Sequence, residues 1–263
     1  MRLLSWNVNR AVAKLGLQAE AVEAREPDVV ALQEVTTTTV STWRERLDER
    51  LPHVVTGWDE AAAVREPAGP PRLAPLVASR WPLEAVEPPA VPWPETVVAV
   101  RVDAPRAPFE LFAVHVPNSR NGWIKVETLE AVHERTSRKD EIPRVICGDF
   151  NTPRSERETG EIVTFAKDRY ARLRPERGER WDAAELALLT GLRDVGMVDV
   201  FRHLHGYVRK EISWNWPRFP RSGYRLDHVI ASLALNPTRC EYVHDVRTTR
   251  LSDHSAIEAD FEP

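Results

Sequence analysis

Runs of apolar residues alternate along the chain with segments in which apolar positions recur at helical spacing. The opening run at 3–8 predicts a buried strand that begins almost at the first residue. Apolar positions then recur at helical spacing up to Pro27, and a second apolar run at 28–35 predicts the next strand. A further helix is expected at 39–50, followed by a short extended segment at 53–57.

The middle of the chain is rich in proline, because residues 67–94 hold nine of its 21 prolines. Such a stretch is typical either of an interdomain linker or of a region of loops and strands. We favour the second interpretation, since the run at 73–79 is too apolar for a solvated linker and its proline indicates a strand edge or beginning. An antiparallel strand pair is expected at 97–102 and 109–116, followed by a helix at 124–138.

The second half of the chain repeats the alternation of strand and helix. A short strand is expected at 144–147, ending at Gly148. Residues 154–180 carry dense charge of mixed sign and predict a surface insertion, followed by a helix at 182–194 that Gly196 terminates. Strands resume at 224–232, 242–247 and 254–261.

This order of elements indicates the fold class. Several strands are close enough in sequence to form hairpins, whereas others are separated by helices. We therefore expect an α/β fold of two packed mixed β-sheets with flanking helices. A chain of 263 residues exceeds the usual domain length, yet α/β domains of this size commonly form one unit, so a single domain over 1–263 is predicted.

Composition narrows the class of protein. Hydrophobic residues make up 42% and charged residues 29% of the chain, which excludes intrinsic disorder for most of it. No apolar run approaches the roughly 20 residues of a membrane helix, and no signal-peptide pattern is present. These features predict a soluble, cytoplasmic protein without membrane contact. Cys147 and Cys240 lie far apart and are expected to be buried apolar residues.

The overall charge does not indicate a nucleic-acid partner, because 40 acidic and 36 basic residues give a net charge of −4. Between Arg202 and Arg225, however, six basic residues accompany a single acid, Glu211, and Trp214, Trp216, Phe219 and Tyr224 are interleaved. The pattern is typical of a phosphate-facing loop with stacking groups. It is equally compatible with a solvated loop whose aromatic rings fold onto the core.

Polar residues stand just beyond the ends of many apolar strands. They are Asn7, Glu34, His115, Asp149, Asn151, Asp227, Asp253 and His254. Any one of them alone is most often a turn former or a helix cap. Together they offer carboxylates for a hard cation such as Mg²⁺ or Mn²⁺, amides to orient phosphate or water, and two histidines. Phosphoryl transfer needs these groups: a metal, a base for water, and donors for the transition state.

Six segments resemble, in order and spacing, the endonuclease/exonuclease/phosphatase superfamily, also called DNase I-like. They are SWNVN (5–9), ALQEV (31–35), HVPN (115–118), GDFN (148–151), YRLDHVIAS (224–232) and LSDH (251–254). GMVDVFRHLHG (196–206), SWNW (213–216) and GYRLD (223–227) are similar to its exonuclease III and apurinic/apyrimidinic endonuclease branch. The resemblance implies a four-layer α/β sandwich and a Mg²⁺- or Mn²⁺-dependent phosphodiester hydrolase.

The resemblance also implies a role for each matching residue. Glu34 would be the principal metal ligand, with Asn7 and Asp253 beside it. Asp149 would position and deprotonate the attacking water, and Asn151 would hold that water or a phosphate oxygen.

His254 would donate to a non-bridging phosphate oxygen, with Asp227 orienting its ring and keeping it cationic. Asn118 would contact the phosphate. In this branch three side chains line a pocket for the abasic deoxyribose, and the matching residues here are Trp214, Tyr224 and Leu226. A role in core or loop packing stays open for these residues.

Three positions depart from the branch. The acidic segment reads LQEV (32–35), where exonuclease III-like enzymes more often have LQET. His115 stands where those enzymes usually have tyrosine. A histidine at this position is similar to other branches of the superfamily, including DNase I-like and phosphodiesterase members, so we keep His115 among the catalytic residues. His228 replaces a usual aromatic or aliphatic residue, and we expect it to be structural or a neighbour of the site. These departures bear on the substrate more than on the chemistry.

The sequence and this resemblance together predict a monomeric DNA repair nuclease, an abasic-site endonuclease or 3′–5′ exonuclease. The resemblance implies that cleavage leaves a 3′-hydroxyl and a 5′-phosphate. An alternative is the same chemistry on a small phosphodiester, nucleotide, RNA or lipid head group, which the net acidic charge and His115 favour. A third possibility is a non-catalytic binding module of the same fold. Competent side chains at every proposed catalytic position argue against it.

Overall fold

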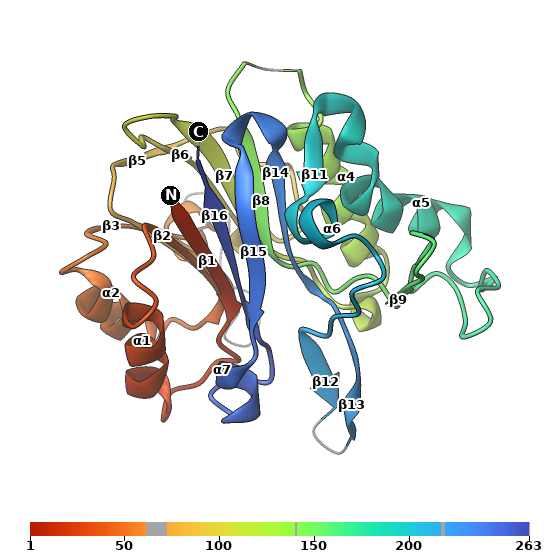
Figure 1. Ribbon diagram of the computed structural model, residues 1–263, viewed down its shortest axis with the longest axis horizontal. Helices are drawn as coiled ribbons and strands as arrows, with labels where there is room; N and C mark the ends of the chain where they lie inside the picture. The colour runs from red at the N-terminus through yellow and green to blue at the C-terminus, as the bar shows by residue number, and fades with distance from the viewer. Residues whose placement is uncertain (62–72, 140, 217–218, 263) are drawn as a thin grey trace.

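Two β-sheets pack face to face in the centre of the molecule, with helices on their outer surfaces (Figure 1). The computed structural model describes residues 1–61, 73–139, 141–216 and 219–262. α1 and α2 cover one sheet, and α4 and α5 cover the other. This helix–sheet–sheet–helix order confirms the four-layer α/β sandwich.

Within the described residues, each large sheet has six strands. In spatial order the first consists of β15 (Pro237–Val243), β16 (Ala256–Phe261), β1 (Arg2–Asn7), β2 (Val29–Val35), β4 (Ala74–Ser79) and β3 (His53–Thr56). The second consists of β11 (Met197–Asp199), β14 (Asp227–Ser232), β8 (Arg144–Asp149), β7 (Phe109–His115), β6 (Val97–Val102) and β5 (Leu83–Ala85). Two short pairs are β9 (Ser155–Glu156) with β10 (Ile162–Val163), and β12 (Trp214–Trp216) with β13 (Phe219–Tyr224).

Helices connect or cover these strands. The α-helices are α1 (Leu15–Glu23), α2 (Val40–Leu47), α3 (Gly57–Ala61), α4 (Trp123–Thr136), α5 (Gly178–Leu189), α6 (Val200–His205) and α7 (Asp245–Thr248). The 3₁₀ turns are η1 (Pro94–Thr96), η2 (Ser119–Asn121), η3 (Gly191–Val195) and η4 (Leu233–Leu235). In the described part of the chain, no helix is long and apolar enough to span a bilayer.

The central strands of both sheets are buried on both faces, which explains their nearly continuous apolar sequence. In β1, Leu3 belongs to the core between the sheets, whereas Leu4 packs in the layer under α1 and α2. On the other side, Val126 of α4 and Trp181 of α5 cover the second sheet. The free cysteines are both buried, as expected.

Strand direction assembles the site at one edge. β1 runs parallel to β2 and β7 runs parallel to β8, so these strands contribute their carboxyl ends. β14 runs antiparallel to β8 and β16 runs antiparallel to β1, so these contribute their beginnings. Polar residues at both kinds of strand end therefore gather together.

Several expected boundaries were wrong. The strand ending at Gly148 continues to Asp149, because the glycine instead permits a close approach: a Cβ there would lie 2.0 Å from the carbonyl oxygen of Val114. The strand expected at 224–232 is interrupted after Tyr224, and the one at 242–247 ends at Val243 before α7.

The insertion at 154–180 is not wholly a surface segment, since Ile162 and Ala166 are buried. The helix expected at 182–194 begins earlier, at Gly178, and the chain turns at Gly196 with a φ of 75°. The strand predicted at 73–79 is confirmed as β4, whereas residues 67–72 of the proline-rich stretch lie outside the described residues.

Candidate active site

A bulge in β2 directs Glu34 into the site. Pairing with β4 passes from Leu32 opposite Leu76 to Val35 opposite Ala74, so Pro75 alone faces Gln33 and Glu34. A proline has no N–H to donate, and such residues are typical of bulges. Glu34 adopts a φ of 59°, a conformation that costs a non-glycine residue about 1–3 kcal/mol and is often found at functional sites.

The carboxylate of Glu34 is surrounded by donors. Its Oε1 accepts a hydrogen bond from Asn7 Nδ2 at 3.3 Å and lies 3.7 Å from His115 Nε2, and its Oε2 lies 3.0 Å from Arg10 Nε. Although burial would raise the pKa of Glu34, the charges of His115 and Arg10 lower it. The group therefore remains anionic at neutral pH.

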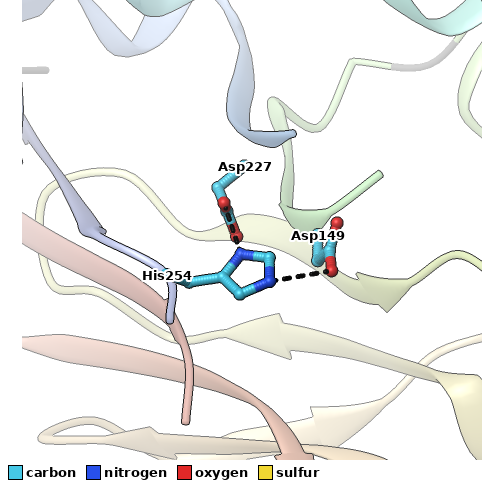
Figure 2. Close-up of side chains that lie close together, drawn as sticks. All are labelled: Asp149, Asp227 and His254. Atoms are coloured by element: carbon cyan, nitrogen blue, oxygen red, sulfur yellow. Dashed lines mark hydrogen bonds and ion pairs between the residues drawn. The ribbon is translucent and has the colours of Figure 1, made fainter. Parts of the chain in front are cut away.

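The imidazole of His254 lies between two carboxylates (Figure 2). Its Nδ1 is 2.8 Å from Asp227 Oδ2, and its Nε2 is 3.8 Å from Asp149 Oδ2. Burial acts to lower the pKa of His254, but the charges of Asp227 and then Asp149 raise it to about 10. Burial raises the pKa of Asp149 to about 6, against the opposing charge of His254. At pH 7 the geometry thus favours an imidazolium beside an ionised Asp149.

Amide groups hold Asp149 in place. Its Oδ2 accepts from Asn7 Nδ2 at 3.1 Å, and its Oδ1 accepts from the backbone N–H of Asn151 at 2.9 Å. The side chain of Asn151 donates to the Val116 carbonyl oxygen at 2.8 Å. Asn7 thus joins the ends of β1, β2 and β8 through its contacts with Glu34 and Asp149.

A pocket of about 810 Å³ opens over these groups. Ten of the site residues expected from the sequence line it: Glu34, His115, Asn118, Asp149, Asn151, Trp214, Tyr224, Leu226, Asp253 and His254. Asn7 and Asp227 reach it through their hydrogen-bond partners. The rings of Trp214 and Tyr224 are parallel, with centroids 5.9 Å apart and planes 2° apart.

In sequence, residues 4–254 match the family model of the Endonuclease/Exonuclease/phosphatase family. The chain belongs to this family. The family expected from the sequence motifs is thereby confirmed.

Curated relatives of the family are similar over most of their length. An exodeoxyribonuclease of Streptococcus pneumoniae is 23% identical, with 88% of this chain and 89% of that protein covered. The DNA repair nuclease APEX1 of Danio rerio is 28% identical, with 98% of this chain and 81% of that protein covered.

Solved structures share the fold. The apurinic/apyrimidinic (AP) endonuclease from Archaeoglobus fulgidus superposes with a TM-score of 0.73 at 18% identity, and both chains are covered completely. The 3′–5′ exonuclease NExo from Neisseria meningitidis gives a TM-score of 0.67 at 17% identity, again with complete coverage of both chains.

The acids of the site fit a hard divalent cation. Asp253 Oδ1 is buried and has no hydrogen-bond partner among the described residues, while its Oδ2 accepts from Trp214 Nε1 at 3.0 Å. A buried carboxylate oxygen without a hydrogen-bond partner destabilises the folded protein unless an ion or another ligand binds it. Oxygen donors of this kind suit Mg²⁺ or Mn²⁺.

The sequence reasoning missed a buried cation that supports the site. Lys125 Nζ donates to the carbonyl oxygen of Asn151 at 2.9 Å and pairs with Glu185 at 2.7 Å. Glu185 in turn accepts from the backbone N–H of Phe165 at 2.8 Å. The signal was a lysine among the apolar positions of the helix predicted at 124–138, which α4 buries completely.

His228 is confirmed as a structural residue. Its ring lies 3.0 Å from Asp199 through Nδ1 and 2.8 Å from the carbonyl oxygen of Thr152 through Nε2. It therefore ties the loop after Asn151 to the end of β11.

Proposed function

We propose that the protein is a metal-dependent DNA phosphodiesterase that cleaves beside abasic sites or removes nucleotides from 3′ ends. The observation that carries this proposal is His254, held between Asp227 and Asp149 on the wall of a pocket that also presents Trp214 and Tyr224. The similarity to an exodeoxyribonuclease and to a DNA repair nuclease supports DNA as the substrate.

The proposed reaction is in-line attack of water on phosphorus. The carboxylate of Asp149 takes the proton of the water as its oxygen bonds to phosphorus, while the bond to the 3′-oxygen breaks. The departing 3′-oxygen takes up a proton, which leaves a 3′-hydroxyl and a 5′-phosphate. His254 donates to a non-bridging oxygen and offsets its growing negative charge. Asn151 and Asn118 hold the water and the phosphate.

Glu34 and Asp253 would hold the cation, with Asn7 beside them. A divalent cation, when bound, would neutralise phosphate charge that these acids would otherwise repel. Support for this assignment comes from the unpaired Oδ1 of Asp253 and from the low pKa of Glu34, which keeps its carboxylate available.

The deoxyribose would occupy the pocket beside Trp214 and Tyr224. With ring centroids 5.9 Å apart, a flat base has no room between the rings, because two stacking distances of ordinary carbon contact, about 3.5 Å each, are needed. The aromatic pair therefore favours a sugar lying against it over an intercalated base.

The test is cleavage of an end-labelled duplex carrying one abasic-site analogue, with Mg²⁺ or Mn²⁺, an EDTA control and the Glu34→Gln variant. We expect metal-dependent incision next to the lesion that the variant loses. An intact duplex of the same sequence serves as the control for 3′-end removal. If neither substrate is cut by the parent protein with metal, the DNA assignment is wrong.

A second candidate keeps the chemistry and changes the substrate to a small phosphodiester, nucleotide, RNA or lipid head group. The position of His115 beside Glu34 and the net charge of −4 favour it. Metal-dependent hydrolysis of bis-p-nitrophenyl phosphate without any cleavage of DNA would support it. A single domain, a monomeric state and a cytoplasmic location remain predictions from the sequence.

A further inference from the structure

The basic residues of the 202–225 segment are largely neutralised by acids, so they are poor phosphate ligands. Arg202 and Arg225 are buried, and each pairs with Glu156 at 2.7 Å. The other two described basic side chains of the segment also have acidic partners: Arg209 pairs with Glu241 and Lys210 lies 3.7 Å from Glu158. For these four residues the ion pairs favour the alternative of a loop whose charges are compensated within the protein.

An excess of positive charge lies instead on the loop at 167–173, which we call the arginine loop. Arg169 and Arg172 are exposed, and neither forms an ion pair with any residue that the structure describes. The one acid within the loop, Asp168, accepts hydrogen bonds from the backbone N–H groups of Tyr170 at 2.8 Å and Arg172 at 3.0 Å. These hydrogen bonds and the charge of Arg172 lower the pKa of Asp168, so one carboxylate offsets part of the charge of the two arginines.

The arginine loop is ordered by its own hydrogen bonds. The backbone N–H of Asp168 donates to the Arg172 carbonyl oxygen at 2.9 Å, and Lys167 bridges to Leu173. Tyr170, 62% exposed, lies under both guanidinium groups, whose central carbons are 4.7 Å (Arg169) and 5.7 Å (Arg172) from its ring centroid. Stacked guanidinium groups lose less conformational freedom on binding phosphate than free side chains do.

Further positive charge connects the arginine loop to the pocket. Arg177 donates to the carbonyl oxygen of Phe165, and Phe165 lines the pocket. Burial, followed by the like charges of Arg174 and Arg154, lowers the pKa of Arg177. Arg154 itself has no hydrogen bond or ion pair within the described ranges. Arginine side chains are therefore also present next to a residue of the pocket wall.

We propose that the arginine loop binds phosphates of the DNA that flanks the cleaved nucleotide. This inference rests on the proposed function and adds a second contact with DNA, outside the active-site pocket. In Figure 1 the segment between β9 and α5 extends along the right-hand edge of the molecule, outside the two sheets. Tyr170 lies five positions after Phe165, so the chain between them spans at most about 18 Å, which corresponds to about five base steps at ~3.4 Å each.

The experiment compares two double variants that remove the same charge. Arg169→Gln/Arg172→Gln changes the arginine loop, and Arg209→Gln/Lys210→Gln changes exposed residues that already have acidic partners. Both are made in the Asp149→Asn protein, so that the DNA stays uncut. The affinity for a 20-base-pair abasic duplex is then measured from low to moderate salt.

Removing one arginine that binds a phosphate should reduce the slope of log affinity against log salt by about 0.9. We expect the arginine-loop variant to bind more weakly, with a slope smaller by up to about 1.8, and the control variant to match the parent. The same substitutions in the active protein should leave hydrolysis of bis-p-nitrophenyl phosphate unchanged.

Unchanged DNA affinity and slope in the arginine-loop variant would overturn the inference and leave the proposed function standing. Equal reductions in both double variants would also overturn it, because net charge would then explain the effect. A parent protein that hydrolyses bis-p-nitrophenyl phosphate but binds no duplex would overturn both the DNA assignment and the role of the arginine loop.

Discussion

The indole N–H of Trp214 donates a hydrogen bond to Asp253 Oδ2 at 3.0 Å. The backbone of Trp214 also bridges to His254, the next residue along the chain from Asp253. One side chain therefore contributes a ring to the substrate pocket and an N–H group to a carboxylate of the proposed metal site. The aromatic pocket and the acidic site are joined at this hydrogen bond.

Trp214→Phe separates these two contributions, because phenylalanine keeps a ring and loses the N–H. We expect the apparent affinity for Mg²⁺ to weaken by about tenfold, as is common when a group that orients a metal ligand is removed. The preference for abasic DNA over intact 3′ ends should persist in this variant and fall in Trp214→Ala. Calorimetry with Mn²⁺ measures the metal affinity independently of turnover. Trp216→Phe is the control, and unchanged metal affinity in Trp214→Phe would contradict the positioning role.

Asp227→Asn should change the pH profile of the reaction more than its metal dependence. In the parent, the rate should rise as Asp149 ionises near pH 6 and fall as His254 loses its proton near pH 10. Asp227 supplies the largest charge that raises the pKa of His254. Without that charge, we expect the alkaline limb to move down towards the ordinary histidine value of 6.5. Rates measured from pH 5 to 10.5 test this, and an unmoved alkaline limb would remove His254 as the group that titrates there.

The sequence was sufficient to predict which polar residues gather, because their positions follow from strand ends. Asn7, His115 and Asp149 each end a strand, and Asp227 begins one. Strand direction in a mixed sheet then brings such residues to the same edge. Periodicity located these strands but not their exact ends, since the strand expected at 144–147 continues to Asp149 and the one expected at 224–232 is divided before Asp227.

Contacts between distant segments were not predictable in this way. Glu156 lies in a segment of dense mixed charge, and nothing local marks it as the partner of Arg202 and Arg225. The bulge that directs Glu34 depends on Pro75, 41 positions away in the sequence. Both features are determined by packing between elements, which single-sequence patterns do not record.

Lys125→Met tests the buried cation behind the loop at Asn151. The substitution leaves Glu185 as a buried charge without its cation, and breaking such a pair typically costs about 3–5 kcal/mol. We expect that decrease in the free energy of unfolding, measured by urea denaturation. We also expect a lower kcat at temperatures where the variant is folded, because the carbonyl group of Asn151 is no longer fixed by a hydrogen bond from the lysine.

A stable variant with parental kcat would show that the ion pair neither stabilises the fold nor positions the loop. Lys139→Met, an exposed substitution, is the control.

Acid should destabilise the protein partly through Glu156. Burial would raise the pKa of this carboxyl, but the charge and hydrogen bonds of Arg225, together with Arg202, lower it to about 2 from its ordinary value of 4.5. Because the folded-state pKa is depressed, the resulting stability is present above pH 4.5 and is lost as the pH falls towards 2. The shift corresponds to a contribution on the order of 3 kcal/mol.

Glu156→Gln removes this contribution and leaves two buried guanidinium groups with less compensation. We expect the variant to be less stable than the parent by about 3–5 kcal/mol at pH 7. The difference should shrink as the pH falls from 5 to 2, since the parent then protonates the same carboxyl. Urea unfolding of both proteins across this range measures the difference, with Glu158→Gln, an exposed neighbour, as the control. A difference that stays constant with pH would mean that Glu156 stabilises the fold through packing and not through its charge, because only the ionised carboxylate attracts Arg202 and Arg225.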